Sequence, residues 1–305
     1  EALIEVINKM ARSIGRRITL QNPRLNAVLP DGSRLHASME PVSSLEVTIR
    51  KFRKRPFTVK DLYEKAGYSP ELLAFLWLVF ESDKNVVICG NTAAGKTTTL
   101  NALFEFVPLN ERVILLEETP EISIPHKHQV RMRTEAGLGI TMKDLIEDSL
   151  RMRPDRVIIG EVRSGDEIRA MIESMNAGQA RGCYATMHAQ SAKELVARLR
   201  YNDIPPSDIV AIDLIIVQRR FLKFDRGKMR EMRRVIEVCE PVEGRSGIGL
   251  QHIFKYDPAK GYAVRTRVKS RILEDIAFMN NTDVETVEKE IEKRAKTMTG
   301  RFAKG

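Results

Sequence analysis

One short stretch, "GNTAAGKTT" at residues 90–98, constrains the fold of this chain more than any other feature. It matches the pattern GxxxxGK[ST] at Gly90, Gly95, Lys96 and Thr97. The apolar segment "NVVIC" runs into it, and the helical pattern "KTTTLNALFEFV" leaves it. In this context glycines let backbone N–H groups wrap phosphates at the N-terminus of a helix. We therefore predict a loop between a strand and a helix that binds a nucleoside triphosphate.

This loop supplies the candidate residues for the nucleotide and its metal ion. Lys96 is expected to reach the β- and γ-phosphates, and the hydroxyl of Thr97 is expected to hold Mg²⁺. The predicted nucleotide-binding residues are those of the whole loop: Gly90, Asn91, Thr92, Ala93, Ala94, Gly95, Lys96, Thr97 and Thr98.

From Tyr63 onward, short apolar segments alternate with helical patterns. Helix start signals precede three of the helical segments, at Thr141, Ser164 and Ser191. This alternation predicts a mostly parallel α/β sheet with its ligand at the carboxyl ends of the strands. The predicted strands are residues 85–90, 112–117, 156–161, 183–188 and 213–218.

Carboxylates follow two of these strands. Glu117 and Glu118 end the segment "VILLEE", and Glu161 follows Gly160 in "RVIIGE". Several acids at one sheet edge repel one another unless a cation or a polarised water lies among them. We expect Glu161 and one member of the Glu117/Glu118 pair to orient Mg²⁺ and the attacking water, and the sequence does not decide which member. Glu161 and Thr97 are the predicted metal ligands, partly through water; the alternative is that the acids are solvated at loop edges.

The chain divides by pattern into two regions. Residues 1–55 combine a helical pattern with three short strands, which predicts a partial α+β N-terminal domain. Because the chain begins with Glu1, we expect this domain to be truncated. A basic stretch, "IRKFRKR", leads into a predicted linker at 56–65, and residues 66–305 are predicted to form the phosphate-binding domain with a strand and helix extension at its end.

Composition limits the remaining classes of function. The net charge is +9, but there is little aromatic interleaving among the basic residues and no recognisable nucleic-acid module, which disfavours nucleic acid as a partner. The longest apolar run, residues 72–80, is shorter than the roughly 20 residues of a membrane span, so no transmembrane segment is predicted. The three cysteines form no CxxC pair, which argues against a structural zinc site, and "PHKHQ" offers His126 and His128 without a third ligand.

Four stretches resemble, in order and spacing, the motifs of the type II/type IV secretion ATPase superfamily. "GNTAAGKTTTLNAL" resembles its Walker A motif, "LLEETPEI" its Asp box, "SLRMRPDRVIIGEVR" its Walker B motif and "AGQARGCYATMHA" its His box. The resemblance covers residues 1–220. "VTIRKF" and "LWLVFESDKNVVICG" look most like the archaeal branch, which drives type IV pili, archaella and related secretion machines.

The resemblance implies a RecA-like P-loop NTPase core that hydrolyses ATP with Mg²⁺ as a homo-hexameric ring. It implies that the N-terminal domain moves relative to the core as nucleotide turns over. The partner it implies is an inner-membrane platform protein of a secretion or pilus machine, and the implied location is the cytoplasm, peripheral at the membrane.

The resemblance also carries residue roles. It makes His188 the final histidine of the His box, and it places Arg50 and Arg53 where the family presents arginines to the γ-phosphate, although a solvated linker is the alternative for these two. An earlier histidine of the box is replaced here by Gln179, which cannot titrate near neutral pH. The predicted catalytic residues are Glu161, Glu117, Glu118, His188, Arg50 and Arg53.

Two other functions remain open at this point. A DNA-translocating or conjugation ATPase has the same core and would use the positive charge. A nucleotide-dependent scaffold would bind ATP and change shape with little hydrolysis, although the acidic motifs argue against it.

Overall fold

The computed structural model describes residues 2–12, 15–51, 55–225, 227–244 and 247–303. It divides into two compact units. The N-terminal unit comprises Glu1–Arg55 with Thr119–Glu121, and the larger unit comprises Pro56–Glu118 with Ile122–Gly305.

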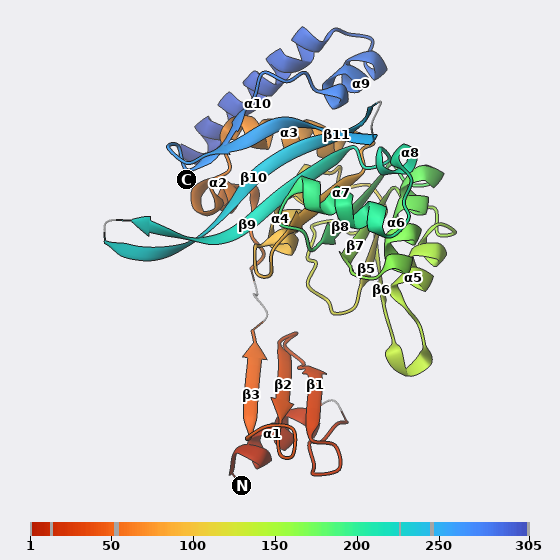
Figure 1. The fold of residues 1–305 in the computed structure, drawn as a ribbon, viewed down its shortest axis with the longest axis vertical. Coiled ribbons are helices and arrows are strands. Elements are labelled where there is room, and N and C mark those ends of the chain that lie inside the picture. Colours follow the sequence, from red (N-terminus) through yellow and green to blue (C-terminus); the bar gives the residue numbers. More distant parts are fainter. Residues whose placement is uncertain (1, 13–14, 52–54, 226, 245–246, 304–305) are drawn as a thin grey trace. The chain divides into compact units, whose positions relative to one another are not determined.

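The N-terminal unit packs one helix on a three-stranded antiparallel sheet (Figure 1). Its core forms because the helix buries Ile7 and Ala11 against Leu25 and Leu35 of the sheet. The helix and the three strands predicted for this region are confirmed. They are α1 (Ala2–Arg12), β1 (Arg24–Val28), β2 (Arg34–Ser38) and β3 (Glu46–Arg50).

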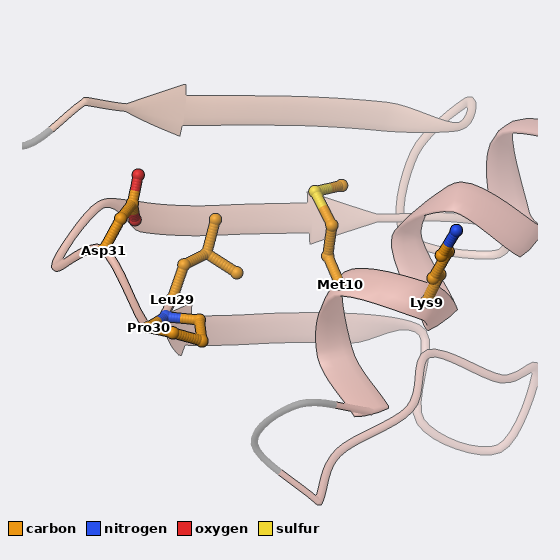
Figure 2. A pocket seen from close by; sticks show the side chains of 5 residues that line it. All are labelled: Lys9, Met10, Leu29, Pro30 and Asp31. Atoms are coloured by element: carbon orange, nitrogen blue, oxygen red, sulfur yellow. The ribbon is translucent and has the colours of Figure 1, made fainter.

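A pocket of about 420 Å³ lies in this unit, between α1 and the turn after β1 (Figure 2). Lys9 and Met10 line it from the helix, and Leu29, Pro30 and Asp31 line it from the turn. The lining is mostly apolar, which does not match the convergent polar groups that hold phosphates.

A nine-stranded sheet forms the centre of the larger unit, in the order β12-β11-β10-β9-β4-β8-β7-β5-β6. The strands from β9 to β6 run parallel, and β10, β11 and β12 continue the sheet in antiparallel fashion (Figure 1). The predicted strands are confirmed as β4 (Val86–Gly90), β5 (Val113–Glu117), β7 (Arg156–Val162), β8 (Gly182–Met187) and the longer β9 (Leu214–Asp225). The others are β6 (Gln129–Arg133), β10 (Lys228–Gly244), β11 (Gly247–Asp257) and β12 (Tyr262–Arg265).

Helices cover both faces of this sheet because its central strands are apolar on both sides. Val86 and Ile88 belong to one core cluster, whereas Val87 and Cys89 belong to the other. The first face is covered by α2 (Val59–Ala66), α3 (Pro70–Glu81), α4 (Lys96–Leu103), α9 (Arg271–Met279) and α10 (Val284–Ala303). The second is covered by α5 (Met142–Ser149), α6 (Gly165–Ala177), α7 (Ala192–Tyr201) and α8 (Pro206–Ile209), and two 3₁₀ turns span Phe104–Phe106 and Ala136–Leu138.

The linker predicted at 56–65 is wrong from Val59 onward, where α2 begins. Thr58 and Asp61 form a capping box at the start of this helix. Val59 and Leu62, three residues apart, are buried in the core of the larger unit. The helix is only eight residues long and closely follows a basic stretch, so its amphipathic pattern is a weak signal.

None of the described helices combines the length and the apolar character that a bilayer crossing requires.

A buried ion pair ties several elements of the larger unit together. Arg156, at the start of β7, is fully buried and binds the carboxylate of Glu111 through two nitrogens, at 2.5 and 3.2 Å. The same guanidinium donates to the hydroxyl of Tyr184 at 2.9 Å and to the carbonyl of Ser82 at 2.7 Å. Arg181, which is half exposed, adds a hydrogen bond of 2.8 Å to Glu111. The charge of Glu111 is therefore compensated mainly by Arg156.

We predict that Arg156→Met lowers the free energy of unfolding by about 3 kcal/mol or more, because Glu111 would keep a buried charge without its main partner. The control Arg181→Met removes a solvent-screened partner of the same carboxylate and should cost about 1 kcal/mol or less. Urea unfolding followed through the fluorescence of Trp77, the single tryptophan, measures both. Equal losses in the two variants would contradict the assigned role of Arg156.

Candidate nucleotide-binding site

The predicted phosphate-binding loop joins β4 to α4. The strand ends at Gly90 and the helix begins at Lys96. Ala93 and Gly95 have φ angles of 59° and 97°, in the left-handed region that glycine adopts without strain. The N–H of Ala94 turns back onto the carbonyl of Asn91 at 3.1 Å. The chain therefore curls tightly in front of the first turn of α4.

The N-terminus of α4 differs from those of α5, α6 and α7. The side chains of Thr141, Ser164 and Ser191 accept a backbone hydrogen bond at the start of those three helices. The N-cap of α4 is Gly95, which makes no side-chain cap hydrogen bond. Because a helix N-terminus attracts anions, phosphate oxygens can take the position that a capping hydroxyl fills in the other helices.

Two close approaches shape the loop. Lys96 is 8% exposed, and its Nζ donates to the carbonyl of Gly90 at 3.3 Å. A Cβ placed on Gly90 would lie 2.0 Å from the carbonyl oxygen of Gln218 in β9. Only glycine therefore allows β4 and β9 to stay paired up to the start of the loop.

Sequence reasoning missed a second support of the loop, which comes from β9 and β10. The side-chain amide of Asn91 donates to the carbonyl of Arg220 and accepts from its N–H, both at 2.8 Å. Arg233 donates from Nε to the carbonyl of Ala93 at 2.8 Å. Glu231 pairs with both arginines, at 2.5 and 2.6 Å. The signal available in the sequence was the pair Arg219 and Arg220, which directly follows the fifth predicted strand.

The carboxyl ends of β7 and β8 bring Glu161 and His188 together. The pairing register of these strands shifts between Ile159 and Val162, and such a bulge re-aims the side chains within it. Nε2 of His188 lies 2.6 Å from Oε1 of Glu161. Arg163 donates to the other oxygen, Oε2, from Nε at 2.9 Å and from Nη2 at 2.5 Å.

The surroundings of Glu161 favour its ionised form. Partial burial alone would raise the pKa of this carboxyl, but the hydrogen bond and charge of Arg163, followed by the charges of His188 and Lys96, outweigh it and lower the pKa below its ordinary value. The positive charge of Lys96, in the phosphate-binding loop, thus helps to lower the pKa of Glu161 at the end of β7. A carboxylate held ionised beside the loop is suited to polarise a water or hold a cation.

The structure separates the neighbouring glutamates Glu117 and Glu118. Glu117 is 2% exposed, is paired with Arg131 of β6 and accepts a backbone N–H at 2.8 Å. Glu118 is 43% exposed and pairs with Arg163 at 2.6 Å. Because Arg163 also binds Glu161, Glu118 joins the charged group at the ends of β7 and β8. We call Glu118, Glu161, Arg163 and His188 the Glu161 cluster.

The three other predicted positions are Arg50, Arg53 and Gln179. Arg50 ends β3 in the N-terminal unit with an exposed side chain, and Arg53 lies outside the described residues. Gln179 is exposed and directly follows Gly178, the left-handed residue that ends α6. Their functional roles stay predictions.

The two neighbouring histidines have protein partners. Nε2 of His126 lies 3.1 Å from the carbonyl oxygen of Pro108, and Nε2 of His128 lies 2.6 Å from the guanidinium of Arg112. In the described part of the chain, the one group of three side chains able to ligate a metal lies elsewhere, on β10 and β11.

One family covers almost the whole chain: the type II/IV secretion system proteins match residues 1–299. The chain belongs to this family. The resemblance drawn from the four motifs is thereby confirmed, and the Glu161 cluster lies on the segments that resemble the family's Asp box, Walker B motif and His box.

Relatives of this secretion-family chain include archaeal and bacterial proteins. Uncharacterized protein MJ0781 of Methanocaldococcus jannaschii is 42% identical over 186 residues, which cover 57% of this chain and 26% of that protein. MJ0900 of the same organism is 32% identical over 285 residues, covering 90% and 51%. The type IV secretion system protein VirB11 of Bartonella quintana is 28% identical over 303 residues, covering 85% and 81%. The chain thus spans about a quarter and about half of the two archaeal relatives.

Two solved structures share the fold. The Legionella pneumophila ATPase DotB matches with a TM-score of 0.57 at 18% identity, covering 96% of this chain and 75% of DotB. The pilus retraction motor PilT with bound ADP matches with a TM-score of 0.52 at 14% identity, covering 86% and 70%. At these identities the likeness shows the fold alone. It confirms the predicted α/β class, with a large parallel-rich sheet and a small N-terminal unit.

Glu117→Gln and Glu118→Gln should affect this family member differently. Glu117→Gln removes the charge from a buried pair and should lower the free energy of unfolding by about 2 kcal/mol. Glu118→Gln alters an exposed pair and should change it by about 0.5 kcal/mol or less. Urea unfolding of both variants measures the difference, and a greater loss in Glu118→Gln would overturn the separation of the two glutamates.

Proposed function

We propose that this chain binds ATP with Mg²⁺ and hydrolyses it to ADP and phosphate. The observation that carries the proposal is the tight loop between β4 and α4, which presents a helix N-terminus without a capping side chain and the buried Lys96. Membership of the secretion family supports it, and the chain shares the fold of DotB, which is described as an ATPase.

The residues of the chain divide the work of phosphoryl transfer. Backbone N–H groups of the loop and the ammonium of Lys96 bind the phosphates and neutralise the charge that develops on them. The hydroxyl of Thr97 and the carboxylate of Glu161 are hard oxygen donors, which fits Mg²⁺ held through one or two protein groups. Bound Mg²⁺ would supply further charge neutralisation at the phosphates.

Within the Glu161 cluster, each side chain has a separate task. Glu161 accepts a proton from, or orients, the attacking water. His188, 2.6 Å from Glu161, fixes one carboxylate oxygen. Arg163 holds the other oxygen and the carboxylate of Glu118, so it offsets the repulsion between the two acids. Glu118 is therefore the member of the predicted pair that we assign to the site.

We further propose that ATP turnover drives a homo-hexameric motor for protein secretion or for filament assembly of the type IV pilus or archaellum kind. In this proposal Arg50 and Arg53 approach the γ-phosphate as the N-terminal unit moves. The partner is an inner-membrane platform protein, and the motor works at the cytoplasmic side of the membrane. Membership of the secretion family supports these assignments. The chain spans about half the length of a relative such as MJ0900, so the assignments are proposals that concern the whole protein.

A DNA-translocating or conjugation ATPase is the second candidate. A putative conjugal transfer protein of Mycobacterium tuberculosis, Rv3659c, is 30% identical over 211 residues, covering 65% of this chain and 59% of that protein. The net charge of +9 is compatible with binding DNA. Hydrolysis stimulated by DNA, with a steep loss on added salt, would select this function.

Lys96→Ala and Glu161→Gln should each slow steady-state phosphate release by roughly a hundredfold or more. Lys96→Ala removes a positive charge that neutralises the phosphates, and Glu161→Gln removes the carboxylate that accepts a proton from, or orients, the attacking water. The matched controls are Lys193→Ala and Glu173→Gln, exposed residues on α7 and α6 that should leave the rate unchanged. Wild-type rates in both site variants would refute hydrolysis at this loop. Tight ATP binding with negligible turnover in the wild type would instead identify a nucleotide-dependent scaffold.

His188→Ala should slow hydrolysis more than Gln179→Ala. His188 touches Glu161 directly, whereas the side chain of Gln179 is exposed after the end of α6. The measurement is the rate of phosphate release at saturating ATP for both variants. A larger effect at Gln179 would show that the first position of the His box carries the function here.

A further inference from the structure

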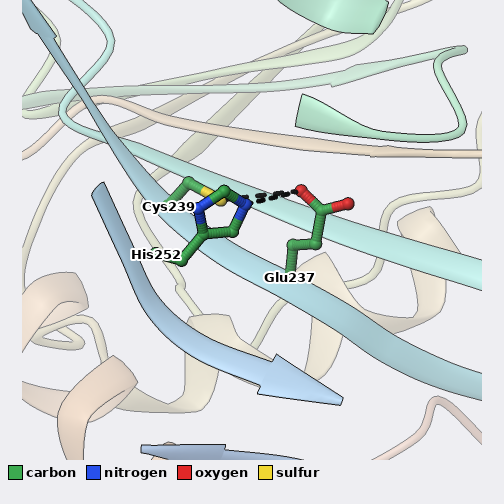
Figure 3. A group of neighbouring side chains, drawn as sticks. All are labelled: Glu237, Cys239 and His252. Atoms are coloured by element: carbon green, nitrogen blue, oxygen red, sulfur yellow. Dashed lines mark hydrogen bonds and ion pairs between the residues drawn. The ribbon is translucent and has the colours of Figure 1, made fainter. Parts of the chain in front are cut away.

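Three side chains of different chemistry meet on β10 and β11, outside the Glu161 cluster. Glu237 and Cys239 lie two residues apart on β10, so they point to the same face of the sheet. His252 on β11 is the direct cross-strand partner of Cys239, so its side chain shares that face. Figure 3 shows the three side chains turned toward one another.

The distances suit a shared ligand. Sγ of Cys239 lies 3.7 Å and Nε2 of His252 lies 3.3 Å from the same oxygen, Oε2 of Glu237 (Figure 3). One ligating atom from each side chain lies within 4.8 Å of the others. Around tetrahedral Zn²⁺, ligand atoms at about 2.0–2.3 Å from the metal are about 3.3–3.8 Å apart. An ion therefore needs only small movements of these side chains.

Neighbouring groups hold the ligands in place. The N–H of Ala192, the first residue of α7, donates to Oε2 of Glu237 at 3.4 Å. The hydroxyl of Thr266 donates to the backbone carbonyl of His252 at 2.6 Å. Cys239 itself is fully buried, while Glu237 and His252 keep 19% and 25% of their side chains exposed. The group is thus supported from within and open to solvent on one side, as a loadable metal site requires.

We propose that Glu237, Cys239 and His252 bind one divalent transition-metal ion of the zinc class. A thiolate, an imidazole and a carboxylate form a donor set that suits Zn²⁺ and Co²⁺, whereas Mg²⁺ and Ca²⁺ take oxygen ligands. The thiolate and the carboxylate together balance the two positive charges of the ion. A water completes the four-coordinate shell from the exposed side.

Loading the site exchanges one proton for one ion. The S–H bond of Cys239 breaks, its proton leaves to solvent, and the sulfur forms a bond to the metal. His252 binds as neutral imidazole through Nε2. No electron is transferred and no other reactant is needed.

The test uses the full chain without a histidine tag, stripped with a chelator and titrated with Co²⁺ while its absorption is recorded. We expect one equivalent to bind with a thiolate-to-cobalt charge-transfer band, and Zn²⁺ to displace it. Cys239→Ser should lose the band. The matched control Cys183→Ser replaces another buried cysteine, on β8, that lies outside the group and should keep it. A wild-type protein without the band, or a band that survives Cys239→Ser, overturns the proposal.

A second variant keeps the proposal testable if Cys239→Ser does not fold. His252→Gln retains the thiol, so the band should remain while the affinity for Co²⁺ falls by at least about tenfold. An unchanged affinity contradicts ligation by His252. ATP hydrolysis is not the readout, so the result does not depend on the proposed ATPase activity.

Discussion

The approach of β4 and β9 at Gly90 is the constraint on which the predicted nucleotide-binding loop depends. The carbonyl of Gln218 occupies the space that a side chain at this position would need. Immediately beyond it, Asn91 pairs with the backbone of Arg220, and Arg233 holds the carbonyl of Ala93. The loop is therefore built onto β9 and β10 as well as onto its own strand. Any rearrangement of the loop around phosphates must be accommodated by these two strands, which continue as a long hairpin (Figure 1).

The strand order explains how charged groups from distant parts of the chain gather beside this loop. β8, β7 and β5 follow β4 in the sheet and run parallel to it, so their carboxyl ends share one edge. His188, Glu161 and Glu118 come from these three ends. The repulsion that several acids would generate at one edge is offset by Arg163, which binds two of them, and by Arg131, which binds Glu117. The protein thus supplies its own counter-charges, and one of them, Arg163, binds Glu161, the carboxylate proposed to be catalytic.

The loop, five of the six parallel strands and the fold class could be predicted from the sequence because each has a local signal: a motif, an apolar run or a capping residue. Other features have none. All five residues of β5 are buried, so no alternation shows which of Glu117 and Glu118 turns inward. β6 lies at the edge of the sheet and is largely exposed. Its basic residues make its sequence resemble that of a loop, so no apolar run marks it as a strand. The outer parts of β9 and β10 are rich in charge and are strands because they pair with each other.

Bulges are the least visible of these features, and they decide which side chains meet on the antiparallel strands. Between Val235 and Glu237, one extra residue in β10 reverses the faces to which the following side chains point. Val235 therefore packs in one core cluster and Cys239 in the other. A second shift sets His252, and not Ile253, opposite Cys239. Since a slip of one residue exchanges the two faces of a strand, a regular ladder would have placed the imidazole away from the thiol. The meeting of Glu237, Cys239 and His252 is thus a product of strand register, which explains why cysteine spacing along the sequence pointed away from a metal site.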